Sequence, residues 1–265
     1  EGVVVIGEGE KDDAPMLFNG ERVGDGTGPQ VDVAVDPIDG TTLCAKGMSN
    51  AISVLAVSER GSMYDPSAVF YMRKLVTGPE AADVVDITAP CSDNLHRVAK
   101  AKGMSVGDLT VCILDRPRHD DLVHEVREAG ARIKFISDGD VAGVIHCAES
   151  EITGIDMYMG SGGAPEGVLA ASALKCMGGQ IYGKLLFRND DEKARAKKAG
   201  ITDLNRIYTR DEMVTADVIF AATGVTTGSI LSGIKREPGW VTTETLLMRS
   251  KTGSVRRMSY RSPVK

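Results

Sequence analysis

The stretch VDVAVDPIDGTTL, residues 31–43, joins a strand pattern to an acidic turn. Apolar and polar residues alternate over positions 31–35, which predicts a β-strand with one buried face. The turn then places Asp36 and Asp39 three residues apart, and Thr41 two residues further on. Because Mg²⁺ and Mn²⁺ prefer oxygen ligands, this pattern predicts a divalent-cation site where the strand ends. Acids at a strand end are also common turn formers, but this motif is longer than a turn requires.

Composition and charge exclude several classes of protein. With 265 residues the chain can form one large domain or two small ones. Its formal net charge of −6 argues against bulk binding to nucleic acid or to an anionic membrane. No apolar run reaches the roughly 18 residues of a membrane span. The five cysteines form no CxxC pair and are odd in number, so we expect no disulfide framework, no thiolate zinc site and a cytoplasmic location.

Apolar runs alternate with amphipathic stretches of helical period, which is typical of an α/β fold. We expect strands near 3–6, 31–35, 51–57, 109–114, 132–136, 155–159, 217–221 and 240–248. Helices are expected near 92–103, 119–130, 140–148, 165–177 and 191–199. The charge-rich stretch 188–198 is the best candidate for a surface connection and a boundary between two sub-domains. Because the chain opens on an apolar strand without a methionine, we expect further residues upstream of Glu1.

A second acidic segment follows the first strand. The run Gly7-Glu8-Gly9-Glu10 resembles part of a dinucleotide-binding fingerprint, but that fingerprint needs a third glycine and an opening helix. The acids of Glu10-Lys11-Asp12-Asp13 also stand where a pyrophosphate would bind. Acids on a glycine-hinged loop suit a divalent cation better, although a solvated acidic turn would account for the same residues.

The third segment is Gly-Ser-Gly-Gly-Ala-Pro-Glu-Gly-Val, residues 160–168. Pro165 suits the first position of a helix, and Glu166 suits its first turn. The preceding glycines would aim backbone N–H groups at an anion, beside a carboxylate that could hold a metal. A glycine-rich loop that merely caps a helix explains the pattern equally well.

Arginines mark a fourth segment, residues 115–119, which follows an apolar run. Arg116 and Arg118 flank Pro117 and would form a stiff fork suited to phosphate, although surface charges in a loop are the ordinary alternative. His119 could orient this loop, but a surface histidine at a helix start is the commoner case.

Two further acids, Asp138 and Asp140, stand at the end of the next strand. Their carboxylates could accept hydrogen bonds from sugar hydroxyls, and Asp140 could equally be a helix N-cap. No serine lies in a G-x-S-x-G elbow, and the cysteines have no evident catalytic partner. Acids from three segments with two arginines therefore indicate metal-assisted hydrolysis of a phosphate monoester.

The motifs also resemble a known family. Asp36-Pro37-Ile38-Asp39-Gly40-Thr41 is similar to the signature of the lithium-sensitive, metal-dependent phosphatases, which include inositol monophosphatases and fructose bisphosphatases. Further runs resemble bacterial class II fructose-1,6-bisphosphatase: IGEGE at 6–10, APML at 14–17, RPRH at 116–119, DGDVA at 138–142, GGAPEG at 162–167 and ATGVT at 222–226. The match runs over essentially the whole chain.

This resemblance implies a layered α/β/α/β sandwich and a single phosphatase unit over residues 1–265. It also implies a metal-binding part, about 1–110, and a part that binds sugar and phosphate, about 111–265. The implied activity is hydrolysis of fructose 1,6-bisphosphate at the 1-phosphate to give fructose 6-phosphate, in gluconeogenesis. Alternatives are a related sugar or inositol phosphatase, such as a sedoheptulose-1,7-bisphosphatase, and a non-catalytic sensor of phosphosugars. A homo-oligomer, tetramer or dimer, is implied by the family alone.

Residue roles follow from the same resemblance. Glu8 would hold one metal ion, Mg²⁺ or Mn²⁺, while Asp36, Asp39 and Glu166 would hold or bridge to another. Thr41, with Asp39, would position or activate the attacking water. The residues implied to contact the substrate are Asp39, Gly40, Thr41, Tyr71, Arg116, Pro117, Arg118, Asp138, Gly139, Asp140 and Gly163. The chain lacks the family's further metal-binding Asp before Glu8, and it has Arg116 where relatives commonly carry Lys.

Overall fold

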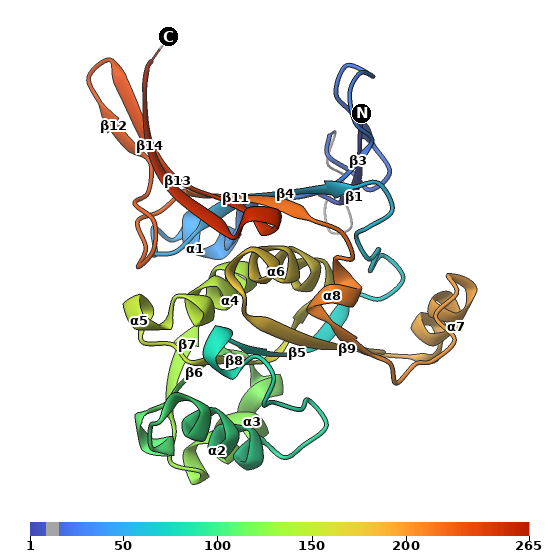
Figure 1. Ribbon diagram of the computed structural model, residues 1–265, viewed down its shortest axis with the longest axis vertical. Coiled ribbons are helices and arrows are strands. Elements are labelled where there is room, and N and C mark those ends of the chain that lie inside the picture. The colour runs from blue at the N-terminus through green and yellow to red at the C-terminus, as the bar shows by residue number, and fades with distance from the viewer. Residues whose placement is uncertain (9–15, 265) are drawn as a thin grey trace.

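The computed structural model describes residues 1–8 and 16–264, and within them the chain forms two β-sheets and several helices (Figure 1). One sheet covers a layer of helices, the second sheet lies on the other side of that layer, and further helices cover the second sheet's outer face. The predicted layered α/β sandwich is confirmed. Residues 9–15, which hold Gly9 to Asp13 of the second acidic segment and Ala14 and Pro15 of the APML run, lie outside the described residues.

The first sheet has the strand order β12-β13-β11-β4-β3-β1-β2, and β14 pairs with β13. Its strands are β1 (Gly2–Ile6), β2 (Arg22–Val23), β3 (Val31–Asp39), β4 (Ile52–Glu59), β11 (Val218–Gly224), β12 (Lys235–Glu237), β13 (Trp240–Arg249) and β14 (Ser254–Pro263). β1 and β3 are parallel, so their carboxyl ends lie at the same edge of the sheet.

The acidic motif differs from the expected turn, because β3 continues through it. The pairing register with β4 shifts between Asp36 and Asp39, which lie opposite Val54 and Ile52. One extra residue on β3 therefore makes a β-bulge, at the point where Pro37 has no N–H to donate to the ladder. The bulge re-aims the acids at the end of the sheet.

The second sheet has the order β10-β9-β5-β8-β6-β7. Its strands are β5 (Tyr71–Thr77), β6 (Thr110–Leu114), β7 (Arg132–Ile136), β8 (Met157–Gly163), β9 (Gln180–Leu186) and β10 (Ile207–Thr209). The strand prediction missed β5, β9 and β10 in this sheet, and β2, β12 and β14 in the first sheet. In β5 the adjacent charges of Arg73 and Lys74 interrupt an otherwise apolar run, and in β9 Gly183 does so. A Cβ at Gly183 would lie 2.4 Å from the sulfur of Met72, so a larger residue there would displace that side chain.

All five predicted helices are present: α2 (Cys91–Lys102), α3 (Asp120–Glu128), α4 (Asp140–Ala148), α6 (Ala164–Met177) and α7 (Asp190–Lys198). Shorter segments are α1 (Thr41–Ala45), α5 (Ser150–Thr153), α8 (Arg210–Met213), η1 (Pro79–Ala81), η2 (Val106–Asp108), η3 (Pro117–His119) and η4 (Ser250–Thr252). No helix in residues 1–8 and 16–264 is long and apolar enough to cross a membrane.

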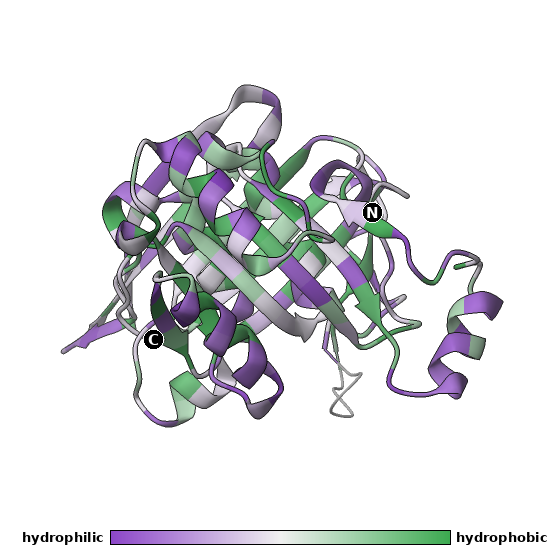
Figure 2. Ribbon diagram, turned by 90° about the horizontal axis from the view of Figure 1, so that it is seen from below, coloured by the Kyte–Doolittle hydropathy of each residue, from purple (hydrophilic) through white to green (hydrophobic). Residues whose placement is uncertain are grey.

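The charge-rich stretch 188–198 forms α7, which lies apart from the rest of the molecule and is predominantly hydrophilic (Figure 2). In the chain, α7 lies between β9 and β10, and these two strands pair with each other. The interpretation of this stretch as a boundary is therefore wrong, since the same sheet lies on both sides of it. The predicted division of roles near residue 110 stays a prediction.

Two hydrophobic cores fill the sandwich. The larger core joins the first sheet, α4, α6 and one face of the second sheet, and it includes Met72 and Val76 of β5. The smaller core joins the opposite face to α2 and α3, and it includes Leu75. The alternation along β5 therefore sends side chains into both cores. The thiols of all five cysteines are free, and all but Cys44 are buried.

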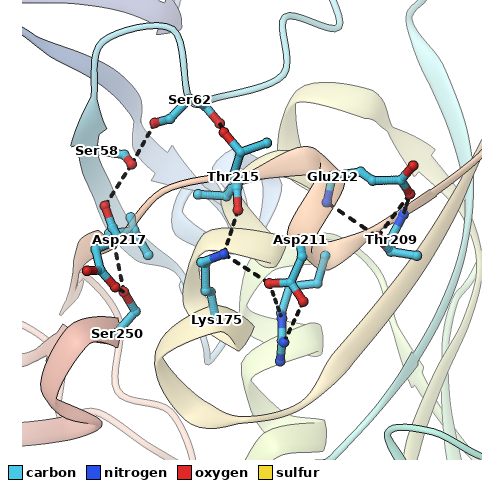
Figure 3. A network of polar contacts seen from close by, with 12 residues as sticks. Ser58, Ser62, Lys175, Thr209, Asp211, Glu212, Thr215, Asp217 and Ser250 are labelled. Carbon is cyan, nitrogen blue, oxygen red and sulfur yellow. Dashed lines mark hydrogen bonds and ion pairs between the residues drawn. The ribbon is translucent and has the colours of Figure 1, made fainter.

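Polar contacts hold the crossing from the second sheet back to the first (Figure 3). Lys175 of α6 donates through Nζ to the carbonyl of Val214, at 2.7 Å, and to Asp211 Oδ1, at 2.9 Å. Asp217 accepts a hydrogen bond from Ser58 of β4 at its carbonyl and from Ser250 at Oδ1, at 2.7 and 2.9 Å. These contacts fix the middle helical layer against β4 and β11.

His146 on α4 predicts a pH-dependent stability. Its Nε2 lies 3.1 Å from Ser229 Oγ, and burial, with a smaller effect of Lys134, lowers its pKa from 6.5 to about 4. As the pH falls, the unfolded chain takes up this proton first, so stability present above about pH 6.5 is lost toward pH 4. His146 is expected to contribute about 2 kcal/mol to the loss of stability between pH 7 and pH 5.

Urea unfolding at pH 7, 6 and 5 measures this loss. His146→Gln should show a smaller loss than the wild type, while the exposed His96→Gln should match the wild type. If the free energy of unfolding fell equally with pH in the wild type and in His146→Gln, the prediction would be contradicted.

Candidate active site

A cavity of about 340 Å³ lies where the ends of both sheets meet the first turns of α4 and α6. It is lined by Ile6, Gly7, Glu8, Asn19, Val35, Asp36, Ile38, Asp39, Gly40, Thr41, Phe70, Tyr71, Leu114, Arg116, Arg118, Asp138, Asp140, Gly162, Gly163, Pro165, Glu166 and Leu169. Every predicted site residue is among them except Pro117 and Gly139. The fold therefore brings the dispersed motifs to one cavity.

Asp39 is the most buried of the clustered acids, with 3% of its surface exposed. Its Oδ2 accepts a hydrogen bond of 3.0 Å from the backbone N–H of Ala142. Burial raises its pKa well above the usual range, and the negative charges of Asp36, Asp140 and Glu166 raise it further. A bound cation would relieve this accumulation of charge.

The ligand atoms of the cavity acids fit a divalent cation such as Mg²⁺ or Mn²⁺, because carboxylates offer only oxygen ligands. Within residues 1–8 and 16–264, no three His, Cys, Asp or Glu side chains already form a group that could hold a metal ion. The acids thus share a cavity without forming a closed ligand set. Asp36 Oδ1 accepts a hydrogen bond from the N–H of Ile38, at 2.9 Å, which orients that carboxylate at the bulge.

The glycines before α6 make room for carboxylates. They do not form a loop, because β8 extends through Gly163, beyond its predicted end at 159. A Cβ on Gly162 would lie 1.8 Å from Asp140 Oδ2, and one on Gly163 would lie 1.8 Å from Glu166 Oε2. A Cβ at either position would therefore displace the acid beside it.

Asp140 is not a helix N-cap, so that alternative is wrong. Gly139 caps α4, with φ of 85°, and Asp140 is the first helical residue. The Asp140 carboxylate is buried and pairs with Lys74, at 2.6 Å, and with Tyr158, at 2.9 Å. Asp138 Oδ2 accepts a hydrogen bond from the N–H of Thr42, at 3.0 Å, which ties the start of α4 to α1.

The two arginines do not form a free fork. Arg118 donates to the Ser161 carbonyl from Nε and Nη2, at 3.2 and 2.7 Å, and its guanidinium carbon lies 5.4 Å from the ring centroid of Tyr71. Arg116 donates from Nη1 to the carbonyl of Asp115, at 2.9 Å. Ser161 therefore orients Arg118, and no described residue accepts a hydrogen bond from its Nη1.

His119 is buried, with 3% of its surface exposed, so the expectation of a surface histidine is wrong. Its Nδ1 lies 2.7 Å from the carbonyl of Leu114, and its Nε2 accepts a hydrogen bond of 2.8 Å from the N–H of Ser161. Burial lowers the pKa of His119, which favours the neutral ring that these two contacts require. His119 therefore orients the arginine segment, as the alternative interpretation held.

Several residues of the site were not predicted: Asn19, Phe70, Lys74, Tyr158 and Ser161. The available signal was Lys74, which together with Arg73 interrupts an apolar run. Its partner lies 66 residues away, so the sequence offers no local clue to the pairing.

Comparisons with known proteins bear directly on this site. The family model described as bacterial fructose-1,6-bisphosphatase, glpX-encoded, matches residues 1–262. The chain belongs to this phosphatase family. It is similar to fructose-1,6-bisphosphatase 1 class 2 of Escherichia coli (strain K12), with 43% identity over 274 aligned residues, 97% of this chain and 80% of the relative. The same values hold for the class 2 enzymes of Escherichia coli O6:H1 (strain CFT073) and Shigella flexneri.

The glycine contacts predict how this fructose-1,6-bisphosphatase family member responds to added methyl groups. Gly162→Ala should displace the Asp140 carboxylate and lower kcat/KM by about 100-fold, because a displacement of about 1 Å in a reactive cavity costs that much. Phosphate release from fructose 1,6-bisphosphate measures the effect. Gly107→Ala is the matched control, since its Cβ would meet nothing closer than 3.7 Å. Equal kcat/KM for the two variants would contradict the prediction.

Proposed function

We propose that this chain hydrolyses fructose 1,6-bisphosphate at the 1-phosphate, giving fructose 6-phosphate and phosphate in gluconeogenesis. The observation that carries the proposal is the single cavity that gathers the acids, Thr41 and two arginines in a member of the fructose-1,6-bisphosphatase family. Opposite charges at one site suit a substrate that carries both phosphate and hydroxyl groups. The acids would serve the metal and the hydroxyls, and the arginines would serve a phosphate.

Divalent cations, Mg²⁺ or Mn²⁺, would be held by Glu8, Asp36, Asp39 and Glu166, as the family resemblance implies. When bound, such ions supply charge that neutralises phosphate oxygens and lowers the pKa of a water. The accumulated negative charge around the buried Asp39 carboxylate supports this assignment. Its fixed hydrogen bond from Ala142 keeps one oxygen of Asp39 oriented in the cavity.

Thr41 would position the attacking water at the scissile phosphate. It is exposed, lines the cavity, and its hydroxyl makes no hydrogen bond to any residue in the described part of the chain. Gly40, with φ of 89°, precedes it and lets the backbone turn from the bulge into α1. The hydroxyl therefore stays available to a water or to the phosphate.

The second phosphate would be bound by Arg116, Arg118 and Tyr71, and the sugar by Asp138, Asp140 and Gly163. Because Ser161 holds one edge of Arg118, the guanidinium would present Nη1 to the phosphate in a fixed direction. This arrangement reduces the entropy lost on binding. Pro117 and Gly139 would act through the backbone, since neither lines the cavity.

Some finer features rest on the resemblance, and the location rests on the cysteine content. We include in the proposal a homo-oligomer, a cytoplasmic location and a metal-binding part over about 1–110. Sedoheptulose 1,7-bisphosphate is the second candidate substrate, because the same metal geometry would hydrolyse it.

Metal removal tests the activity. Phosphate release from fructose 1,6-bisphosphate should require Mn²⁺ or Mg²⁺, stop with EDTA and return with excess cation, because the carboxylates alone repel phosphate. Asp36→Asn should raise the cation concentration needed for half-maximal activity. Release that continues unchanged in EDTA would overturn the metal assignment. Tight sugar binding without any phosphate release would instead favour a sensor, and faster release from sedoheptulose 1,7-bisphosphate would change the substrate.

The proposed role of Thr41 predicts that its replacement changes kcat much more than KM. Thr41→Ala should lower kcat by about 100-fold or more with KM changed by less than about threefold, because the hydroxyl acts in the transition state. Thr41→Ser should recover much of the turnover, and Thr42→Ala should behave as the wild type. Full turnover by Thr41→Ala would remove Thr41 from the mechanism.

A further inference from the structure

A lysine lies buried behind the active site. Lys74, in the middle of β5, has 1% of its surface exposed. It shares a strand face with Met72 and Val76, so it points into the larger core, toward α4 and α6. Its Nζ lies 2.6 Å from Asp140 Oδ2. A buried ammonium group is costly unless it is paired, and within residues 1–8 and 16–264 Asp140 is its only ion-pair partner.

Tyr158 completes the contact from the neighbouring strand. In the antiparallel pair of β5 and β8, Tyr158 lies opposite Val76. Val76 is on the same face of β5 as Lys74, so the side chains of Lys74 and Tyr158 share one face of the sheet. The Tyr158 hydroxyl donates to Asp140 Oδ1, at 2.9 Å. Burial raises the pKa of Tyr158, which keeps it a hydrogen-bond donor.

Asp140 is therefore held at both oxygens by groups of the second sheet. It still lines the cavity, and the missing side chain of Gly162 leaves the space that its Oδ2 occupies. The adjacent acid Asp39 is held differently, because its hydrogen bond comes from the backbone N–H of Ala142 and brings no full positive charge. Two acids of the same cavity thus differ in whether a fixed cation neutralises them.

We propose that Lys74 and Tyr158 are positioning residues that hold Asp140 as a fixed acceptor for a substrate hydroxyl. Their contacts also keep Asp140 from acting as a ligand of the divalent cation. A carboxylate whose charge is already paired attracts a divalent cation weakly. Each oxygen keeps a second lone pair, so the acid can still accept a hydrogen bond from the sugar. This inference rests on the proposed function, because it assumes a sugar substrate in this cavity.

Steady-state kinetics with fructose 1,6-bisphosphate test the positioning role. Lys74→Met should raise KM by about 10- to 100-fold, and Tyr158→Phe by about 3- to 10-fold, with kcat within about threefold of wild type. Lys184→Met, on the neighbouring strand β9, should leave both constants unchanged. A fall in kcat at unchanged KM for the two variants would overturn the inference.

Metal titration tests the second half of the proposal. Asp140→Asn should leave the Mn²⁺ concentration for half-maximal activity unchanged, whereas Asp36→Asn should raise it. A rise in Asp140→Asn as large as that in Asp36→Asn would make Asp140 a metal ligand and overturn the inference.

A double-mutant cycle shows whether Lys74 acts through Asp140. In an Asp140→Asn background, neither Lys74→Met nor Tyr158→Phe should raise KM further. The Lys74→Met/Asp140→Asn chain carries a neutral pair, so it remains informative if Lys74→Met alone fails to fold. Independent, multiplying increases in KM would overturn the inference. No phosphate release by the wild type would refute the proposed function instead, so the two failures are distinguishable.

Discussion

Repulsion between carboxylates that share one cavity constrains the whole site. Asp39 is almost fully buried, and both this burial and the charges of Asp36, Asp140 and Glu166 raise its pKa. Like charges in a low-dielectric interior are costly unless donors or cations compensate them. The glycines leave space for the acids, the bulge in β3 sets the direction of two of them, and the buried lysine neutralises one.

The compensation comes in two forms. Lys74 is a permanent cation, fixed in the core and paired with Asp140. Asp39 instead receives a backbone hydrogen bond from Ala142, which brings no full positive charge. Under the proposed function, this difference would let one acidic cavity bind metal with some carboxylates and a sugar with another.

The middle helical layer makes these positions precise. α4 and α6 lie between the two sheets, and their first turns carry Asp140 and Glu166 into the cavity. Side chains held by packing on both sides of a layer lose little freedom when a ligand binds. Gly162 and Gly163, at the end of β8, let those two acids approach the sheet more closely than any side chain would permit.

The α/β class, the five longer helices and the acids of the cavity could be predicted from the sequence, because periodicity and a contiguous motif such as residues 36–41 are local properties. The tertiary structure alone decided that β5 is a strand, that His119 is buried and that Asp140 is paired. Lys74 is a charge in an apolar run until Asp140, 66 residues away, becomes its neighbour. Long-range pairing sets burial and charge compensation, and no local pattern encodes it.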